Sequence, residues 1–114
     1  MSLQSLLAPL QTAPGVRGAL VVSREDGLVV SSALGEGVNG AAVAALSASL
    51  SRRIHLLTEA LGQPDPPFFE LEGAEGILMA APARTGLLLV AVTSRDADRE
   101  LVHRHLLRLA EEVG

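Results

Sequence analysis

The sequence predicts an α+β domain: a five-stranded antiparallel sheet with a long helix on one face and the terminal helices on the other. Three observations support this prediction. Five short apolar segments have the length of strands, and an Asp-Gly pair, a strong hairpin signal, lies between the first two. One long helical segment separates these two strands from the other three. The segments 19–22 and 87–92 are apolar at successive positions, which indicates a sheet buried on both faces.

The first expected element is a short amphipathic helix at the N-terminus. A hairpin of strands 18–25 and 27–34 follows, and it turns at Asp26-Gly27 because glycine accepts a positive φ there. Glycines then interrupt the chain before the long helix, which is expected from about Asn39 to Leu61. The apolar spacing of the first helix rests on Leu3, Leu6, Leu7 and Leu10.

Three strands and a final helix are expected in the rest of the chain. The strands are 68–73, 76–83 and 86–94, and the charges of the first suit the edge of a sheet. The last helix is expected to reach about Val113, with Asp96 or Ser94 as its N-cap. Its apolar stripe consists of Leu101, Val102, Leu106, Leu109 and Val113. No linker or repeat interrupts this series, so residues 1–114 are expected to form a single domain.

Composition excludes several classes of function. The sequence has 114 residues, of which 48% are apolar and 19% charged, so a folded core is expected. It contains no cysteine, which excludes disulfides and thiolate chemistry. A net charge of −4, scattered arginines and few aromatic residues argue against binding nucleic acid. The chain has neither a membrane-spanning run nor the basic start of a signal peptide, and a cytoplasmic protein is expected.

Motifs that suggest catalysis or cofactor binding are weak. GEGVNG at 35–40 matches a dinucleotide-binding glycine pattern, but the preceding strand belongs to a hairpin and not to a parallel βαβ unit. His103 and His105 point away from each other on a helix, and His55 lies on another helix, so no metal site is expected. Ser49 and Ser51 lack the pattern of a nucleophile with its base. We therefore expect no cofactor, no small-molecule substrate and no enzymatic activity.

The long helix has two contrasting faces at 100° per residue. Its larger residues fall within one narrow arc, which is the expected core stripe: Val43, Leu46, Leu50, Ile54, Leu57 and Leu61. The opposite side is expected to face outward: Ala41, Ala44, Ala48, Ser51, Arg52, His55 and Glu59. Small side chains allow a second helix to approach closely, so this side is a candidate docking face. The alternative is an ordinary exposed helix in an alanine-rich protein, and Arg52-Arg53 can either pair with acidic groups of a partner or simply be solvated.

The pattern of the two hairpins resembles a known family. PGVRGALVVSREDGLVVSSA (14–33) is similar to the opening hairpin of roadblock/dynein light chain proteins, and residues 76–113 resemble their closing hairpin and helix. The order of elements agrees over nearly the whole chain. Within the family, the likeness is to bacterial MglB-type regulators of small Ras-like GTPases, some of which carry a C-terminal extension that this sequence lacks.

This resemblance implies a homodimer that pairs through the long helix and the third strand. The dimer would present its helices to a small Ras-like GTPase of the MglA type and stimulate GTP hydrolysis without an arginine finger. An adaptor dimer that leaves GTP turnover unchanged is the alternative, and a small-molecule sensor with an enclosed pocket is a third hypothesis. The residues implied for the dimer and partner interface are Ala41, Ala44, Ala45, Ala48, Arg52, His55, Phe68, Phe69, Glu70, Leu71 and Glu72.

Overall fold

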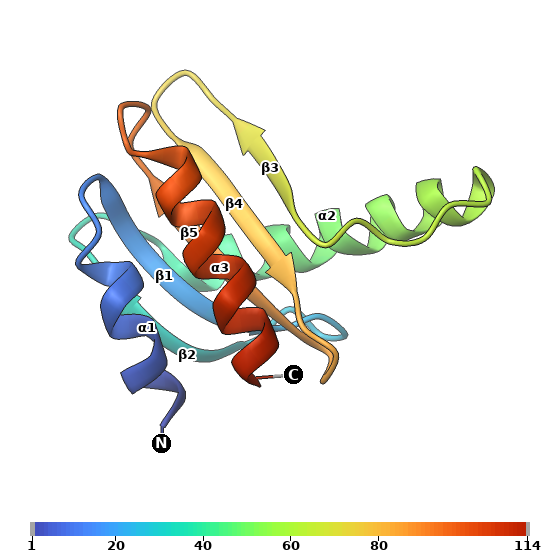
Figure 1. The fold of residues 1–114 in the computed structure, drawn as a ribbon, viewed down its shortest axis with the longest axis horizontal. Coiled ribbons are helices and arrows are strands. Elements are labelled where there is room, and N and C mark those ends of the chain that lie inside the picture. Colours follow the sequence, from blue (N-terminus) through green and yellow to red (C-terminus); the bar gives the residue numbers. More distant parts are fainter. Residues whose placement is uncertain (1, 114) are drawn as a thin grey trace.

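The computed structural model describes residues 2–113 and contains the predicted sheet (Figure 1). The five strands have the spatial order β2-β1-β5-β4-β3, and every neighbouring pair is antiparallel. Helix α2 lies on one face of this sheet, and helices α1 and α3 lie on the other. The elements in chain order are α1 (Leu3–Gln11), β1 (Val16–Ser23), β2 (Val29–Leu34), α2 (Gly40–Ala60), β3 (Phe69–Glu72), β4 (Ile77–Pro82), β5 (Leu87–Thr93) and α3 (Arg99–Val113). The predicted fold class is therefore confirmed.

Capping and turn residues account for the element boundaries. Asn39 caps α2, since its side-chain oxygen accepts a hydrogen bond of 3.1 Å from the backbone N–H of Ala42. The β1–β2 connection is longer than predicted and spans residues 24–28, with Gly27 at a φ of 73°. The cap of α3 also differs from the prediction: Asp98, and not Asp96 or Ser94, accepts from the N–H of Leu101.

Two apolar layers cover the two faces of the sheet. Alternate residues of β1 supply each layer: Ala19 and Val21 face α1 and α3, whereas Leu20 and Val22 face α2. On the α1–α3 side, the helices supply large residues, and Val102, Leu106 and Leu109 of α3 are buried as predicted. On the α2 side, the large residues of the strands meet small residues of the helix. Both faces of the sheet are therefore covered, as the apolar strands predicted.

Helix α2 is rotated relative to the prediction. The residues buried against the sheet are the small ones, which we call the sheet-facing stripe: Gly40, Ala44, Ser47, Ala48 and Ser51. Much of the predicted core stripe faces outward, since Leu46, Leu57 and Leu61 are 70%, 59% and 64% exposed. Val43 still packs against the core, as predicted. Ala44 and Ala48 are therefore core residues and not the outward docking residues that the sequence suggested.

Close packing explains this rotation. Strands β1 and β5 already fill the space beneath α2 with Leu20, Leu88 and Val90. The β1–β2 connection also lies against the helix, and a Cβ added at Gly27 would be 3.2 Å from the Cα of Ala45. Little room is left between helix and sheet, so only side chains of the size of alanine and serine fit there.

Candidate functional site

An exposed row of large apolar side chains runs along the outer side of α2. We call it the leucine stripe, and it consists of the residues that the sequence analysis had assigned to the core: Val43, Leu46, Leu50, Ile54, Leu57 and Leu61. Leu46, Leu57 and Leu61 are largely exposed, while Val43, Leu50 and Ile54 are half-buried. Leu56, on another side of the helix, is also exposed. Monomeric proteins rarely expose a contiguous apolar surface of this kind, so the leucine stripe is a candidate interface.

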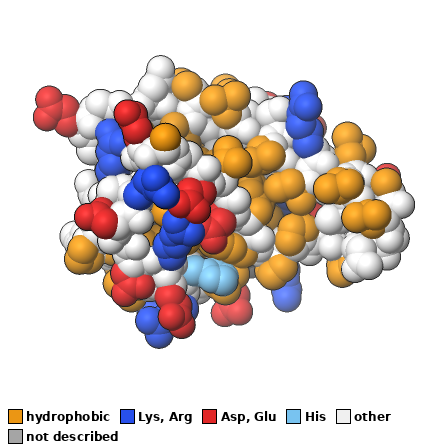
Figure 2. All heavy atoms as spheres, turned by 90° about the horizontal axis from the view of Figure 1, so that it is seen from above, with side chains coloured by type: hydrophobic (Ala, Val, Ile, Leu, Met, Phe, Trp, Pro, Cys, Tyr) orange, Lys and Arg blue, Asp and Glu red, His pale blue; other side chains and the backbone are white. Residues whose placement is uncertain are grey.

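The second half of α2 projects beyond the sheet (Figure 1). The helix has 21 residues and is therefore about 31 Å long. It crosses a sheet whose five strands, spaced about 4.8 Å apart, span only about 20 Å. Hydrophobic side chains accumulate on this projecting part, whereas charged side chains cluster near the start of α3 (Figure 2). Leu57 and Leu61 thus lie beyond the part of the helix that packs on the sheet, whereas Leu46 is exposed beside the buried Ala44 and Ala48.

Strand β3 forms the sheet edge from which α2 projects. It pairs only with β4 among residues 2–113, so its other side offers unpaired backbone N–H and C=O groups. Phe69 and Leu71 lie on the α2 side of the sheet, and Leu71 is 59% exposed. The apolar side of this edge therefore continues the apolar surface of the leucine stripe.

The two glutamates of β3 lie on the other side of the sheet and form ion pairs there. The guanidinium of Arg99 is 2.8 Å from the Glu72 carboxylate and 3.7 Å from that of Glu70, and Arg95 is 3.0 Å from Glu72. Hydrogen bonds from Arg99 first, and then from Arg95, hold the pKa of Glu72 below its usual value. Phe68 lies on the same side and stacks on His103, with ring centroids 3.8 Å apart.

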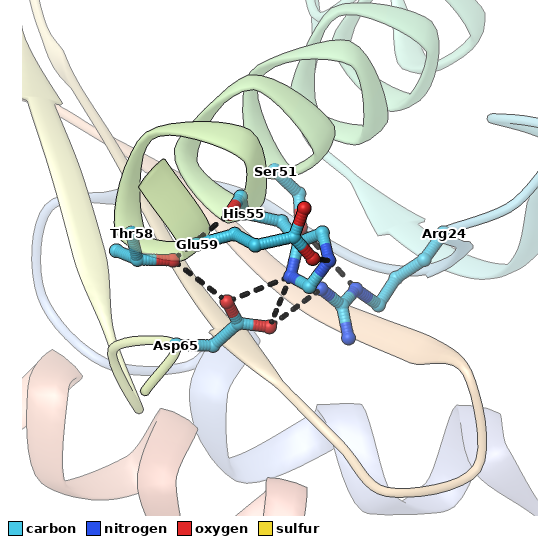
Figure 3. Close-up of polar contacts among 6 residues, drawn as sticks. All are labelled: Arg24, Ser51, His55, Thr58, Glu59 and Asp65. Carbon is cyan, nitrogen blue, oxygen red and sulfur yellow. Dashed lines mark hydrogen bonds and ion pairs between the residues drawn. The ribbon is translucent and has the colours of Figure 1, made fainter. Parts of the chain in front are cut away.

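A polar cluster fixes the segment between α2 and β3 (Figure 3). The Nδ1 atom of His55 is 2.8 Å from one carboxylate oxygen of Asp65 and 3.0 Å from the other, and Thr58 donates a hydrogen bond to Asp65. The hydrogen bond to His55, followed by the one to Thr58, lowers the pKa of Asp65. Arg24 donates from Nε to Ser51 and lies 3.9 Å from Asp65, so the β1–β2 connection is joined to the same cluster.

The cluster borders an open hollow of about 670 Å³ between α2 and the strand turns. Arg24, Arg52 and Asp65 line it together with Leu56 and Leu87. The hollow is open to solvent, so it does not supply the enclosed pocket that a small-molecule sensor requires. Within the described part of the chain, no group of three metal-ligating side chains occurs, and no helix has the length and apolar content needed to span a membrane.

The interface residues suggested by the sequence are distributed over different surfaces. Ala41, Ala45, Arg52 and His55 are exposed on α2, whereas Ala44 and Ala48 are buried under it. Phe69 to Glu72 lie on the sheet edge, as expected. The leucine stripe lies at the surface, although its spacing had predicted a core stripe. One signal could have revealed it, because a helix this long cannot be covered along its whole length by a five-stranded sheet.

Comparison with protein families identifies the class of this protein. Residues 3–93 match the Roadblock/LC7 domain, and the chain belongs to that family. A comparison with curated proteins gives no sequence match.

Solved structures support the same fold. A Roadblock/LC7 domain from Streptomyces avermitilis superimposes with a TM-score of 0.88 at 24% identity, covering 99% of this chain and 95% of that one. MglB of Myxococcus xanthus gives 0.85 at 20% identity, covering 96% and 83%. An MglB with a tetrameric arrangement gives 0.84 at 25% identity, covering 96% and 82%. The chain is thus similar to MglB over most of its length.

Proposed function

We propose that this protein is a cytoplasmic, non-enzymatic homodimer that binds and regulates a small Ras-like GTPase of the MglA type. The observation that carries the proposal is the leucine stripe, which leaves large apolar side chains in water in the isolated chain. Covering these side chains removes apolar surface from water, which is the main driving force for association. The likeness to MglB supports a second copy as one partner and a GTPase as the other.

In the proposed dimer, two β3 edges pair and join the sheets of the two copies. The projecting half of each α2 then extends over the neighbouring copy, on the side where Phe69, Leu71 and Leu78 are incompletely buried. Each leucine stripe thereby covers apolar surface on the other copy. This arrangement uses the free edge of β3 and the projecting half of α2 at once.

The GTPase is proposed to dock on the part of α2 that the second copy leaves free. Ala41, Ala45 and Arg52 are exposed there, and the small side chains allow a partner to approach the helix backbone closely. We propose that binding rearranges the catalytic groups of the GTPase, with no arginine inserted from this protein. By its likeness to MglB, we also propose that the protein acts in bacterial cell polarity.

A hydrolysis assay tests the regulatory part of the proposal. The single-turnover rate of GTP hydrolysis by an MglA-type GTPase would be measured alone, with this protein, and with its Ala45→Arg variant. We expect acceleration by the native protein and less acceleration by the variant, whose substitution lies on the exposed face of α2. Binding without any change in rate would favour the adaptor alternative, and no binding would contradict the proposal.

A further inference from the structure

The side chains of β3 constrain how two copies of this strand can pair, if the proposed dimer forms. Residues directly opposite each other in an antiparallel pair point to the same face of a sheet. Consider a joined sheet in which both α2 helices lie on one face. Each glutamate of β3 must then lie opposite a residue of the second copy that points to the other face, the one that carries α3. On that side, β3 contributes only Glu70 and Glu72.

Only two such alignments pair at least three of the four residues of β3. If the alignment is centred on Glu70, this residue lies opposite Glu70 of the second copy. If it is centred on Leu71, Glu70 lies opposite Glu72 of the second copy, and this contact occurs twice. Both of these alignments therefore bring carboxylate against carboxylate, and like charges directly opposite are destabilising.

The chain supplies its own counter-ions for these carboxylates. Arg95, in the β5–α3 connection, and Arg99, at the first position of α3, come from outside the strand, and together they contact both glutamates at 2.8 to 3.7 Å. Their side chains are 57% and 41% exposed, so they are not part of the buried core. Both arginines approach on the face of the sheet that carries α3, and this leaves the unpaired backbone edge free.

We propose that Arg95 and Arg99 neutralise the β3 edge so that it can pair with a second copy of this chain. The glutamates alone would repel a like edge, and they become compatible with self-association only together with the two arginines. This inference rests on the proposed homodimer and assigns the role of these two arginines in it.

The test measures the dimer dissociation constant of Arg95→Gln/Arg99→Gln by sedimentation at low salt. We expect a dissociation constant about tenfold higher than that of the native protein. The difference should shrink as salt is raised, because salt screens exposed like charges. Adding Glu70→Gln/Glu72→Gln to the same protein should restore the native value. Arg104→Gln/Arg108→Gln removes the same charge from exposed positions of α3 and serves as the matched control.

The outcomes separate this inference from the proposed dimer itself. A native protein that dimerises while Arg95→Gln/Arg99→Gln has the native dissociation constant would overturn the inference alone. A dissociation constant that stays raised after the glutamates are also replaced would overturn it too. Such a result would mean that the arginines only hold β3 in place against α3. A native protein that stays monomeric overturns both. Thermal unfolding of each variant, at a concentration where the native protein is monomeric, verifies that the fold is intact.

Discussion

Helix α2 carries small side chains on the side that faces the sheet and large apolar side chains on the side that faces solvent. The side against the sheet carries Ala44, Ser47 and Ala48, all fully buried, whereas the side toward solvent carries Leu46 and Leu57. In an ordinary amphipathic helix, the large apolar residues face the core. The difference shows that apolar size alone does not identify the core face when the opposing strands already fill the space. We propose that these large side chains instead pack on a second copy of the chain.

The largest expected effect comes from a charge placed on the sheet-facing stripe. Ala48→Arg would bury an unpaired guanidinium against Leu20 and Leu88, and we expect the free energy of unfolding to fall by about 3–5 kcal/mol. The matched control is Ala41→Arg on the exposed side of the same helix, for which a change within about 0.5 kcal/mol is expected. Urea unfolding measures both. Equal stability of the two variants would mean that Ala48 faces outward after all.

Two serines of the sheet-facing stripe should respond in opposite directions. Ser47 is fully buried, and its hydroxyl has no hydrogen-bond partner among residues 2–113, so Ser47→Ala should raise the free energy of unfolding by about 1 kcal/mol. Ser51→Ala should lower it by about 1 kcal/mol, because the Ser51 hydroxyl accepts from Arg24 Nε at 3.2 Å. Urea unfolding of the two variants compares them directly. A stabilising Ser51→Ala would contradict this role for the hydroxyl.

The smallest expected effect concerns the polar cluster at the end of α2. The pKa of Asp65 is lowered chiefly by His55, so its contribution to stability is present above the ordinary pKa and is lost as pH falls through the lowered value. In His55→Ala, the titration midpoint of the Asp65 carboxyl should rise toward 3.8, and in Thr58→Val it should rise less. Carbon-detected NMR titration gives both midpoints. Identical midpoints in the native protein and His55→Ala would exclude the contact in solution.

The fold could be predicted from the sequence because the signals for its strands and for the start of α2 come from residues close together in the chain. Asp26-Gly27 marked the first hairpin, and the apolar segments 19–22 and 87–92 indicated a sheet covered on both sides. The rotation of α2 was not predictable in this way. It depends on how closely Gly27 lets the β1–β2 connection approach Ala45, and that proximity arises only in the folded molecule.

The candidate site was predicted only in part for the same reason. The strand expected at residues 68–73 was predicted to lie at an edge from its charges, and β3 (Phe69–Glu72) does lie there. The ion pairs of Glu72 with Arg95 and Arg99 join residues more than twenty positions apart, and no spacing in the sequence reveals them. The leucine stripe was visible as a pattern, but periodicity alone cannot distinguish a stripe that packs on its own sheet from one that packs on another chain.

The central claim is that the leucine stripe is the self-association surface, and its most direct test is the solution mass of Leu46→Glu/Leu57→Glu beside the native protein. We predict that light scattering at micromolar concentration gives twice 11.8 kDa for the native protein and 11.8 kDa for the variant. The variant should keep its fold, since both leucines are exposed in the isolated chain. A monomeric native protein, or a folded variant that still has the doubled mass, would contradict the account.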